Sequence, residues 1–141
     1  MKLEDRRKLF AALSAKFPDE AVERTDGKIT GRGYSTSGIK AQYIINRLTE
    51  VLGVGGWRIH REITVHEVTT ASGRKCYEAL CDLVLELGSF EDGKFVQFAE
   101  GVGNGNHTSV SRGDAVKGAL TNSIKRVAAF VCGAGWEAYC G

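Results

Sequence analysis

The stretch RGDAVKGALTNSIKRVAAFVCG, residues 112–133, decides the fold because it has the pattern of one long helix with a buried side. Apolar residues recur at spacings of three and four, the helical period (Val116, Leu120, Ile124, Val127 and Val131). Ser111 followed by Asp114 matches a capping box, with Asp in place of the usual Glu or Gln. Gly133 then breaks the pattern. The sequence therefore predicts a core helix over about 112–131.

Two adjacent cations, Lys125 and Arg126, lie in the middle of this apolar run, although Lys and Arg are almost never fully buried unless paired. At 100° per residue, Lys117, Thr121 and Lys125 fall along one polar stripe. Arg126 lies one step around the helix, and Asp114 is the only acid in it. A row of donors without acids favours contact with phosphate oxygens. A solvated helix face remains the alternative.

The segments before this helix alternate between helical and strand periods. We expect helices at about 4–16 and 37–52, a loop at 24–36, and strands beginning at Trp57, Lys75 and Lys94. Ser37 is the expected cap of the second helix. Short turns join the three strands, which predicts an antiparallel meander. The fold class is therefore α+β, a three-stranded antiparallel meander flanked by helices with an α-β-β-β-α core.

The stretch GVGNGNHTSVSRGD, residues 101–114, reads as a glycine-rich loop between the last strand and the last helix. Such a loop can cradle phosphate through backbone N–H groups, so a nucleotide-binding enzyme that uses residues 101–106 is one alternative function. The Walker spacing is absent, and no general base lies at a suitable spacing. We therefore expect no enzyme, no cofactor and no metal site.

The chain of 141 residues suits one domain, 1–141, with 1–23 as a peripheral N-terminal helix. Its net charge of +2 conceals a pattern. Residues 24–61 carry seven cations against two acids, and residues 109–127 carry four against one. Residues 62–108 carry three cations against eight acids. If the fold brings the two basic segments together, they form a cationic face.

The cysteines and histidines give no sign of a metal centre. Cys76, Cys81, Cys132 and Cys140 form no CxxC pair, and we expect reduced, mostly buried thiols. His60 and His66 lie six residues apart, too far to share one metal ion. Without an apolar signal core or a stretch long enough for a membrane span, the protein is expected to be intracellular.

Several of these features together resemble a known family. GWRIH after a helix, the meander, and AVKGALTNSIKRVAAFVCGAGWEAY (115–139) are similar to the single-strand DNA annealing proteins of the Rad-fifty-two superfamily. That group includes eukaryotic recombination mediators, phage annealases and the bacterial DNA damage response protein A. The likeness covers about residues 30–140, and its specific part is A-x-K-x-A-x-T-[DN]-x-x-K-R followed by a glycine-bounded turn and an aromatic residue.

The resemblance implies a closed ring of many subunits that holds single-stranded DNA in a basic groove and anneals complementary strands without ATP. It implies roles in homologous recombination and double-strand break repair, and a cytoplasmic, nucleoid-associated protein of a bacterium or phage. A recombinase or a single-strand-binding protein is a further candidate partner. A double-stranded RNA-binding module, which shares the element order and a basic last helix, is the second alternative.

The resemblance also assigns DNA contacts. The Lys-Arg pair of the family maps onto Lys125 and Arg126, and the earlier helix lysine maps onto Lys117. A basic residue of the preceding helix has no matching position, although Lys40 and Arg47 are close. Ala129 stands where eukaryotic members carry a further cation. The basic segments and the polar stripe add the remaining candidates, Arg58, Arg112 and Thr121.

Overall fold

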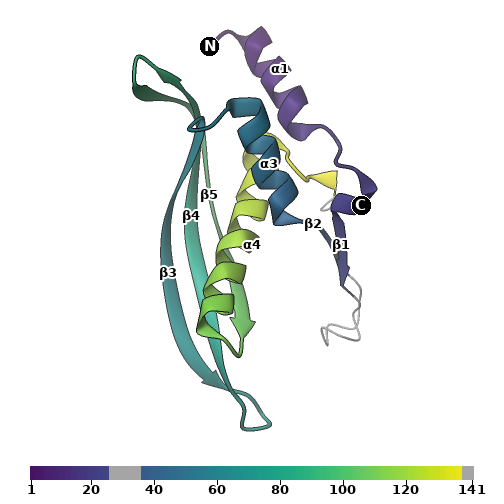
Figure 1. Cartoon of the computed structure of the whole chain (residues 1–141), viewed down its shortest axis with the longest axis vertical. Helices are drawn as coiled ribbons and strands as arrows, with labels where there is room; N and C mark the ends of the chain where they lie inside the picture. The colour runs from purple at the N-terminus through teal and green to yellow at the C-terminus, as the bar shows by residue number, and fades with distance from the viewer. Residues whose placement is uncertain (26–35, 138–141) are drawn as a thin grey trace.

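The computed structural model describes residues 1–25 and 36–137 (Figure 1). The elements in chain order are α1 (Leu3–Ser14), the short 3₁₀ helix η1 (Asp19–Ala21), β1 (Val22–Thr25), β2 (Thr36–Ile39), α3 (Ala41–Leu52), β3 (Trp57–Thr69), β4 (Lys75–Glu91), β5 (Lys94–Ser109) and α4 (Arg112–Cys132). The α+β class is confirmed, and the expected order of helices and strands holds except for η1 and the β1–β2 pair, which the sequence did not predict.

Strands β3, β4 and β5 form the predicted antiparallel meander, with β4 in the centre. Side chains alternate between the two faces of a strand. One face of β4 is buried along its length (Ala79, Cys81, Leu83, Leu85 and Leu87). Ile59 of β3 lies opposite Leu85, and Gly101 of β5 lies opposite the same leucine. The sheet therefore has one apolar face, and α4 packs against it.

Helix α4 lies between the sheet and a second layer made of α3, α1 and the β1–β2 hairpin (Figure 1). Ser111 caps its start by accepting a hydrogen bond from the backbone N–H of Asp114, and Gly133 ends it in the left-handed conformation at φ 74°. Ile124 and Val127 are buried as expected. The first half of α4 and the lower half of the sheet project beyond α3 in Figure 1.

The expected glycine-rich loop at 101–114 is wrong as far as Ser109, because these residues continue β5. Gly101, Gly103 and Gly105 occupy alternate positions and face α4. A Cβ on Gly105 would lie 2.5 Å from the backbone nitrogen of Ser123. The glycines are thus spaced for close helix–strand packing. The nucleotide-binding alternative loses the loop on which it depended.

The expected Ser37 cap is also wrong. Residues 36–39 form β2, which pairs with β1 so that Ile39 lies opposite Val22, and Ile39 is 3% exposed. Helix α3 begins at Ala41 after Lys40, and no side chain caps it. The gain from burying Ile39 in the core outweighs a serine cap, which contributes about 1 kcal/mol. The middle of the loop expected at 24–36 lies outside the described residues.

The N-terminal segment contributes to the core as well as to the surface. Most of α1 is exposed, yet Leu13 is 2% exposed and Phe17, just beyond the helix, is 5% exposed. None of the helices in the described part of the chain has the length and hydrophobicity of a membrane-spanning segment.

Candidate nucleic-acid interface

The two adjacent cations of α4 reach toward different neighbours. Lys125 leans toward β1, and its Nζ lies 3.9 Å from Oε2 of Glu23, with 20% of the Lys125 side chain exposed. Arg126 is exposed and leans toward β5, where its Nη1 donates to the backbone carbonyl of Asn104 at 2.9 Å. Neither charge is buried without a partner, and together they border both sides of one helix.

A second stripe of α4, formed by Gly118, Asn122 and Arg126, contacts β5, the edge strand of the sheet. Asn122 Nδ2 donates to the carbonyl of Asn106 at 3.0 Å, as Arg126 does to Asn104. One turn earlier, the absence of a side chain on Gly118 leaves room for the ring of His107. Edge strands with free carbonyls invite pairing with other chains. Arg126 therefore has a structural partner in addition to its predicted role.

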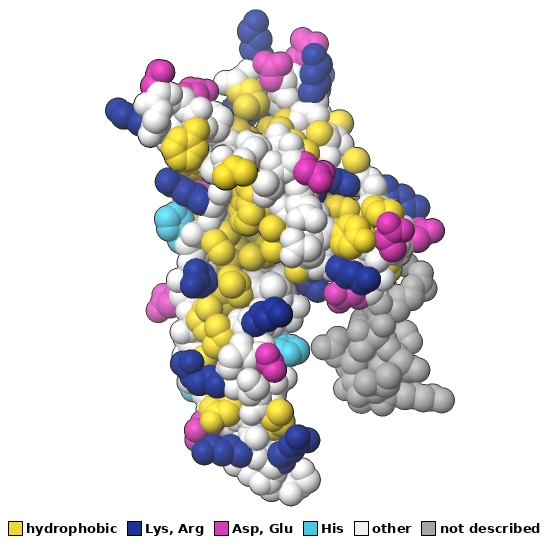
Figure 2. All heavy atoms as spheres, in the orientation of Figure 1, with side chains coloured by type: hydrophobic (Ala, Val, Ile, Leu, Met, Phe, Trp, Pro, Cys, Tyr) yellow, Lys and Arg dark blue, Asp and Glu magenta, His cyan; other side chains and the backbone are white. Residues whose placement is uncertain are grey.

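The remaining candidates on α4 occupy its projecting half. Lys117 and Arg112 are exposed. The hydroxyl of Thr121 donates to the carbonyls of Lys117 and Gly118, at 3.1 and 3.3 Å, so its proton is already used within the helix. Figure 2 shows Lys and Arg side chains spread over the projecting part with acids between them. On this face of one subunit, the cations do not form an unbroken patch.

Arg47 of α3 is engaged within the subunit. Its Nη1 donates to the carbonyls of Leu13 and Ala15, at 3.0 and 2.7 Å, where α1 ends. Its guanidinium lies 4.0 Å from the centroid of the Phe17 ring, a cation–π contact. Arg47 thus ties α1 to α3. Lys40, by contrast, is exposed immediately before α3, and its backbone N–H donates to the carbonyl of Ala21.

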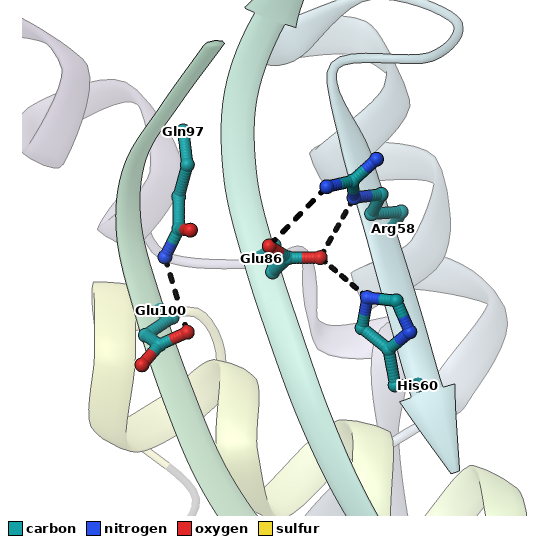
Figure 3. Close-up of polar contacts among 5 residues, drawn as sticks. All are labelled: Arg58, His60, Glu86, Gln97 and Glu100. Atoms are coloured by element: carbon teal, nitrogen blue, oxygen red, sulfur yellow. Dashed lines mark hydrogen bonds and ion pairs between the residues drawn. The ribbon is translucent and has the colours of Figure 1, made fainter. Parts of the chain in front are cut away.

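Arg58 lies on the face of the sheet that points away from α4. It is opposite Glu86 in the register, one residue from the pair that faces the helix. Its Nε donates to Oε2 of Glu86 at 2.7 Å, and Nε2 of His60 lies 2.6 Å from the same oxygen (Figure 3). The hydrogen bonds from Arg58 and then His60 lower the pKa of Glu86, against a smaller opposing effect of burial.

The guanidinium of Arg58 also lies 4.2 Å from the centroid of the Phe95 ring. The structure therefore places Arg58 and Arg47 away from the stripe of α4 and brings Lys117, Thr121, Lys125 and Arg126 together on one helix. The contact of Glu86 with Arg58 and His60 could be predicted only in part. Strand alternation places Glu86 on the polar face of β4, but no local pattern shows which residues of the neighbouring strand it meets.

The cysteines and the possible metal ligands are the other reactive groups of the chain. Cys76, Cys81 and Cys132 are free and buried, as expected, while Cys140 lies outside the described residues. Burial raises the pKa of the Cys132 thiol. Within residues 1–25 and 36–137, no group of three or more His, Cys, Asp or Glu side chains is arranged to hold a metal ion.

A three-stranded meander packed on a long helix that carries exposed cations defines this chain as an α+β domain of the β-β-β-α type. It belongs to the Rad52/22 family of double-strand break repair proteins, whose family model matches residues 5–136. That range includes every described element apart from the first two residues of α1. The family resemblance inferred from the sequence is thereby confirmed. No curated protein matches the chain.

No role was predicted from the sequence for two residues of this region, Glu23 and Asn122. Glu23 lies outside the basic segment that begins at residue 24, so it was grouped with the N-terminal helix. Asn122 was not among the expected site residues, but its side chain donates to the backbone of β5 at Asn106. Both depend on contacts between elements distant in the chain, and no local pattern reports such contacts.

Proposed function

We propose that this protein binds single-stranded DNA and anneals complementary strands without ATP, within the double-strand break repair that defines its family. The observation that carries the proposal is the helix α4. Lys117 and Lys125 share one stripe and Arg126 lies beside it; the stripe begins at Lys117 in the half of α4 that projects beyond α3, and it continues to Lys125 next to β1. Lys117 and Lys125 lie eight residues apart, about two helical turns, and cations in such a row can contact the phosphates of an extended strand.

Such a site would act by holding the backbone and leaving the bases free to sample a second strand. Binding through phosphates carries no base readout, so affinity should vary little with sequence. Three cations per subunit correspond to a slope of log K against log salt no steeper than about −2, at roughly −0.7 per phosphate contact on a single strand. A few contacts per subunit give weak binding, and an oligomeric ring would strengthen it by repetition.

We also propose that the ring, rather than one subunit, supplies a continuous basic groove. The mixed charges of Figure 2 favour this arrangement, because neighbouring copies would have to bring their own cations to fill the gaps. We propose no catalytic step. The glycine-rich residues 101–106, the candidate for nucleotide binding, lie in β5, and Gly101, Gly103 and Gly105 among them pack against α4.

Charge reversal on α4 tests the proposal. Lys117→Glu, Lys125→Glu and Arg126→Glu should each weaken binding of a fluorescent oligonucleotide by roughly tenfold, because each removes an attraction and adds a repulsion. Lys117→Glu is the cleanest of the three, since Arg126 also bonds β5 and Lys125 faces Glu23. Annealing of two complementary oligonucleotides should slow in parallel.

Lys94→Glu is the matched control, because Lys94 begins β5 and so lies at the opposite end of the sheet from the first turn of α4. It should bind as the wild type does. Thermal melting would check that each variant is folded. Wild-type affinity in all three α4 variants would refute the proposal, and tighter binding of duplex RNA than of single-stranded DNA would favour the RNA-binding alternative.

A further inference from the structure

One acid reaches into the cationic stripe of α4 from another layer. Glu23 is in β1, and its Oε2 lies 3.9 Å from Nζ of Lys125. The Glu23 side chain is 49% exposed, whereas the Lys125 side chain is 20% exposed. Both ends of the contact thus remain open to solvent, and a phosphate oxygen could take the place of the carboxylate without rearrangement of the core.

The surroundings of Glu23 give it no other evident structural task. Its cross-strand partner in the hairpin is Gly38, which has no side chain to pack against it. A Cβ added at Gly38 would meet nothing within 4 Å, so the space around this pair is open. A half-exposed Lys–Glu pair of this kind adds little to stability. Glu23 therefore acts mainly through the negative charge that it places beside Lys125.

We propose that Glu23 is a positioning residue of the DNA interface: it holds Lys125 at the groove when no strand is bound and competes with phosphate for it. The inference rests on the proposed binding of single-stranded DNA. A competing carboxylate lowers the affinity of each subunit and speeds release. That suits annealing, since a strand gripped too tightly cannot shift its register while it searches for complementary bases.

The test is a titration of a fluorescent oligothymidylate against wild type, Glu23→Gln, Lys125→Gln and the double variant over a range of salt. Glu23→Gln should tighten binding about two- to fivefold at low salt, the scale of one half-exposed ion pair. It should also steepen the salt slope by up to about 0.7, because Lys125 then neutralises a phosphate in full. In the Lys125→Gln background the same change should have no effect.

Glu4→Gln is the matched control, because Glu4 faces Lys8 at 3.8 Å on α1, away from the stripe, and its loss removes the same charge. It should leave binding unchanged. The inference is overturned if wild type binds and Glu23→Gln binds equally or more weakly, or if it tightens binding to the same extent without Lys125. Absence of binding by wild type would overturn the proposed function itself and the inference with it.

Discussion

Replacing Gly105 by alanine should destabilise the subunit more than the same change at the other glycines of β5. The Cβ of the alanine would lie 2.5 Å from the backbone nitrogen of Ser123 and 2.9 Å from the carbonyl carbon of Asn122. Both are backbone atoms of α4, so no side-chain rotation can relieve the overlap. The helix must move away from the strand.

The required movement sets the magnitude. Ordinary contact begins near 3.4 Å, so α4 would have to shift by about 0.9 Å at this point. The helix is packed on its other side by the second layer, and Ser123 and Ile124 are buried. Inserting a methyl group into such a site costs about 1–3 kcal/mol or more. At Gly103 the clash is with a methyl group of Val127, at 2.8 Å, and we expect about 1 kcal/mol.

Gly38→Ala is the control, because nothing lies within 4 Å of the added Cβ. It should be neutral or stabilise by up to about 1 kcal/mol, through the loss of freedom in the unfolded chain. Urea unfolding followed by circular dichroism, at one protein concentration for all variants, gives the free energies of unfolding. If Gly105→Ala and Gly38→Ala have the same stability, the glycines do not set the distance between β5 and α4.

Two further changes test the contacts assigned above. Arg47→Ala should lower the free energy of unfolding by about 2 kcal/mol, because it removes two hydrogen bonds to backbone carbonyls and the cation–π contact with Phe17. It should leave oligonucleotide binding intact. A loss of binding without a loss of stability would instead place Arg47 in the interface. The lowered pKa of Glu86 stabilises the fold above about pH 4.5, and this contribution is lost as the pH falls through the folded-state pKa. Glu86→Gln should therefore flatten the acid limb of stability against pH, and an unchanged limb would contradict the role of Arg58.

The periodic elements could be predicted because their signals are local. The apolar residues of α4 repeat every three to four residues over about four turns, from Val116 to Val131, and the strands alternate for long enough to determine which face is buried. The family motif lies in this same helix, so one stretch predicted both the core helix and the position of Lys125 and Arg126 on it; their contact with DNA stays a prediction. The ends of elements were predicted least well, as at Ser37, where pairing with β1 decides the start of the helix.

The glycine-rich segment misled for a physical reason. Glycine is depleted in strands and enriched in loops, so GVGNGN indicated a loop. The alternate spacing of Gly101, Gly103 and Gly105 carried the other meaning, a strand face that a helix approaches closely. The loop interpretation and the strand interpretation differ only in what lies opposite the glycines. That partner is α4, whose Val131 and Val127 lie opposite Gly101 and Gly103 and whose backbone at Ser123 lies opposite Gly105.

The same close packing explains why two adjacent cations can sit on a largely buried helix. Because α4 lies directly against β5, the backbone carbonyl of Asn104 comes within reach of Arg126, which donates to it and stays exposed. Lys125, 100° further round, meets the hairpin instead and finds Glu23. The charges are therefore held by two different layers on either side of the helix. A strand of DNA that binds here would replace the contact of Lys125 more readily than that of Arg126, since the first is a long ion pair at the surface and the second a bond of 2.9 Å to the backbone.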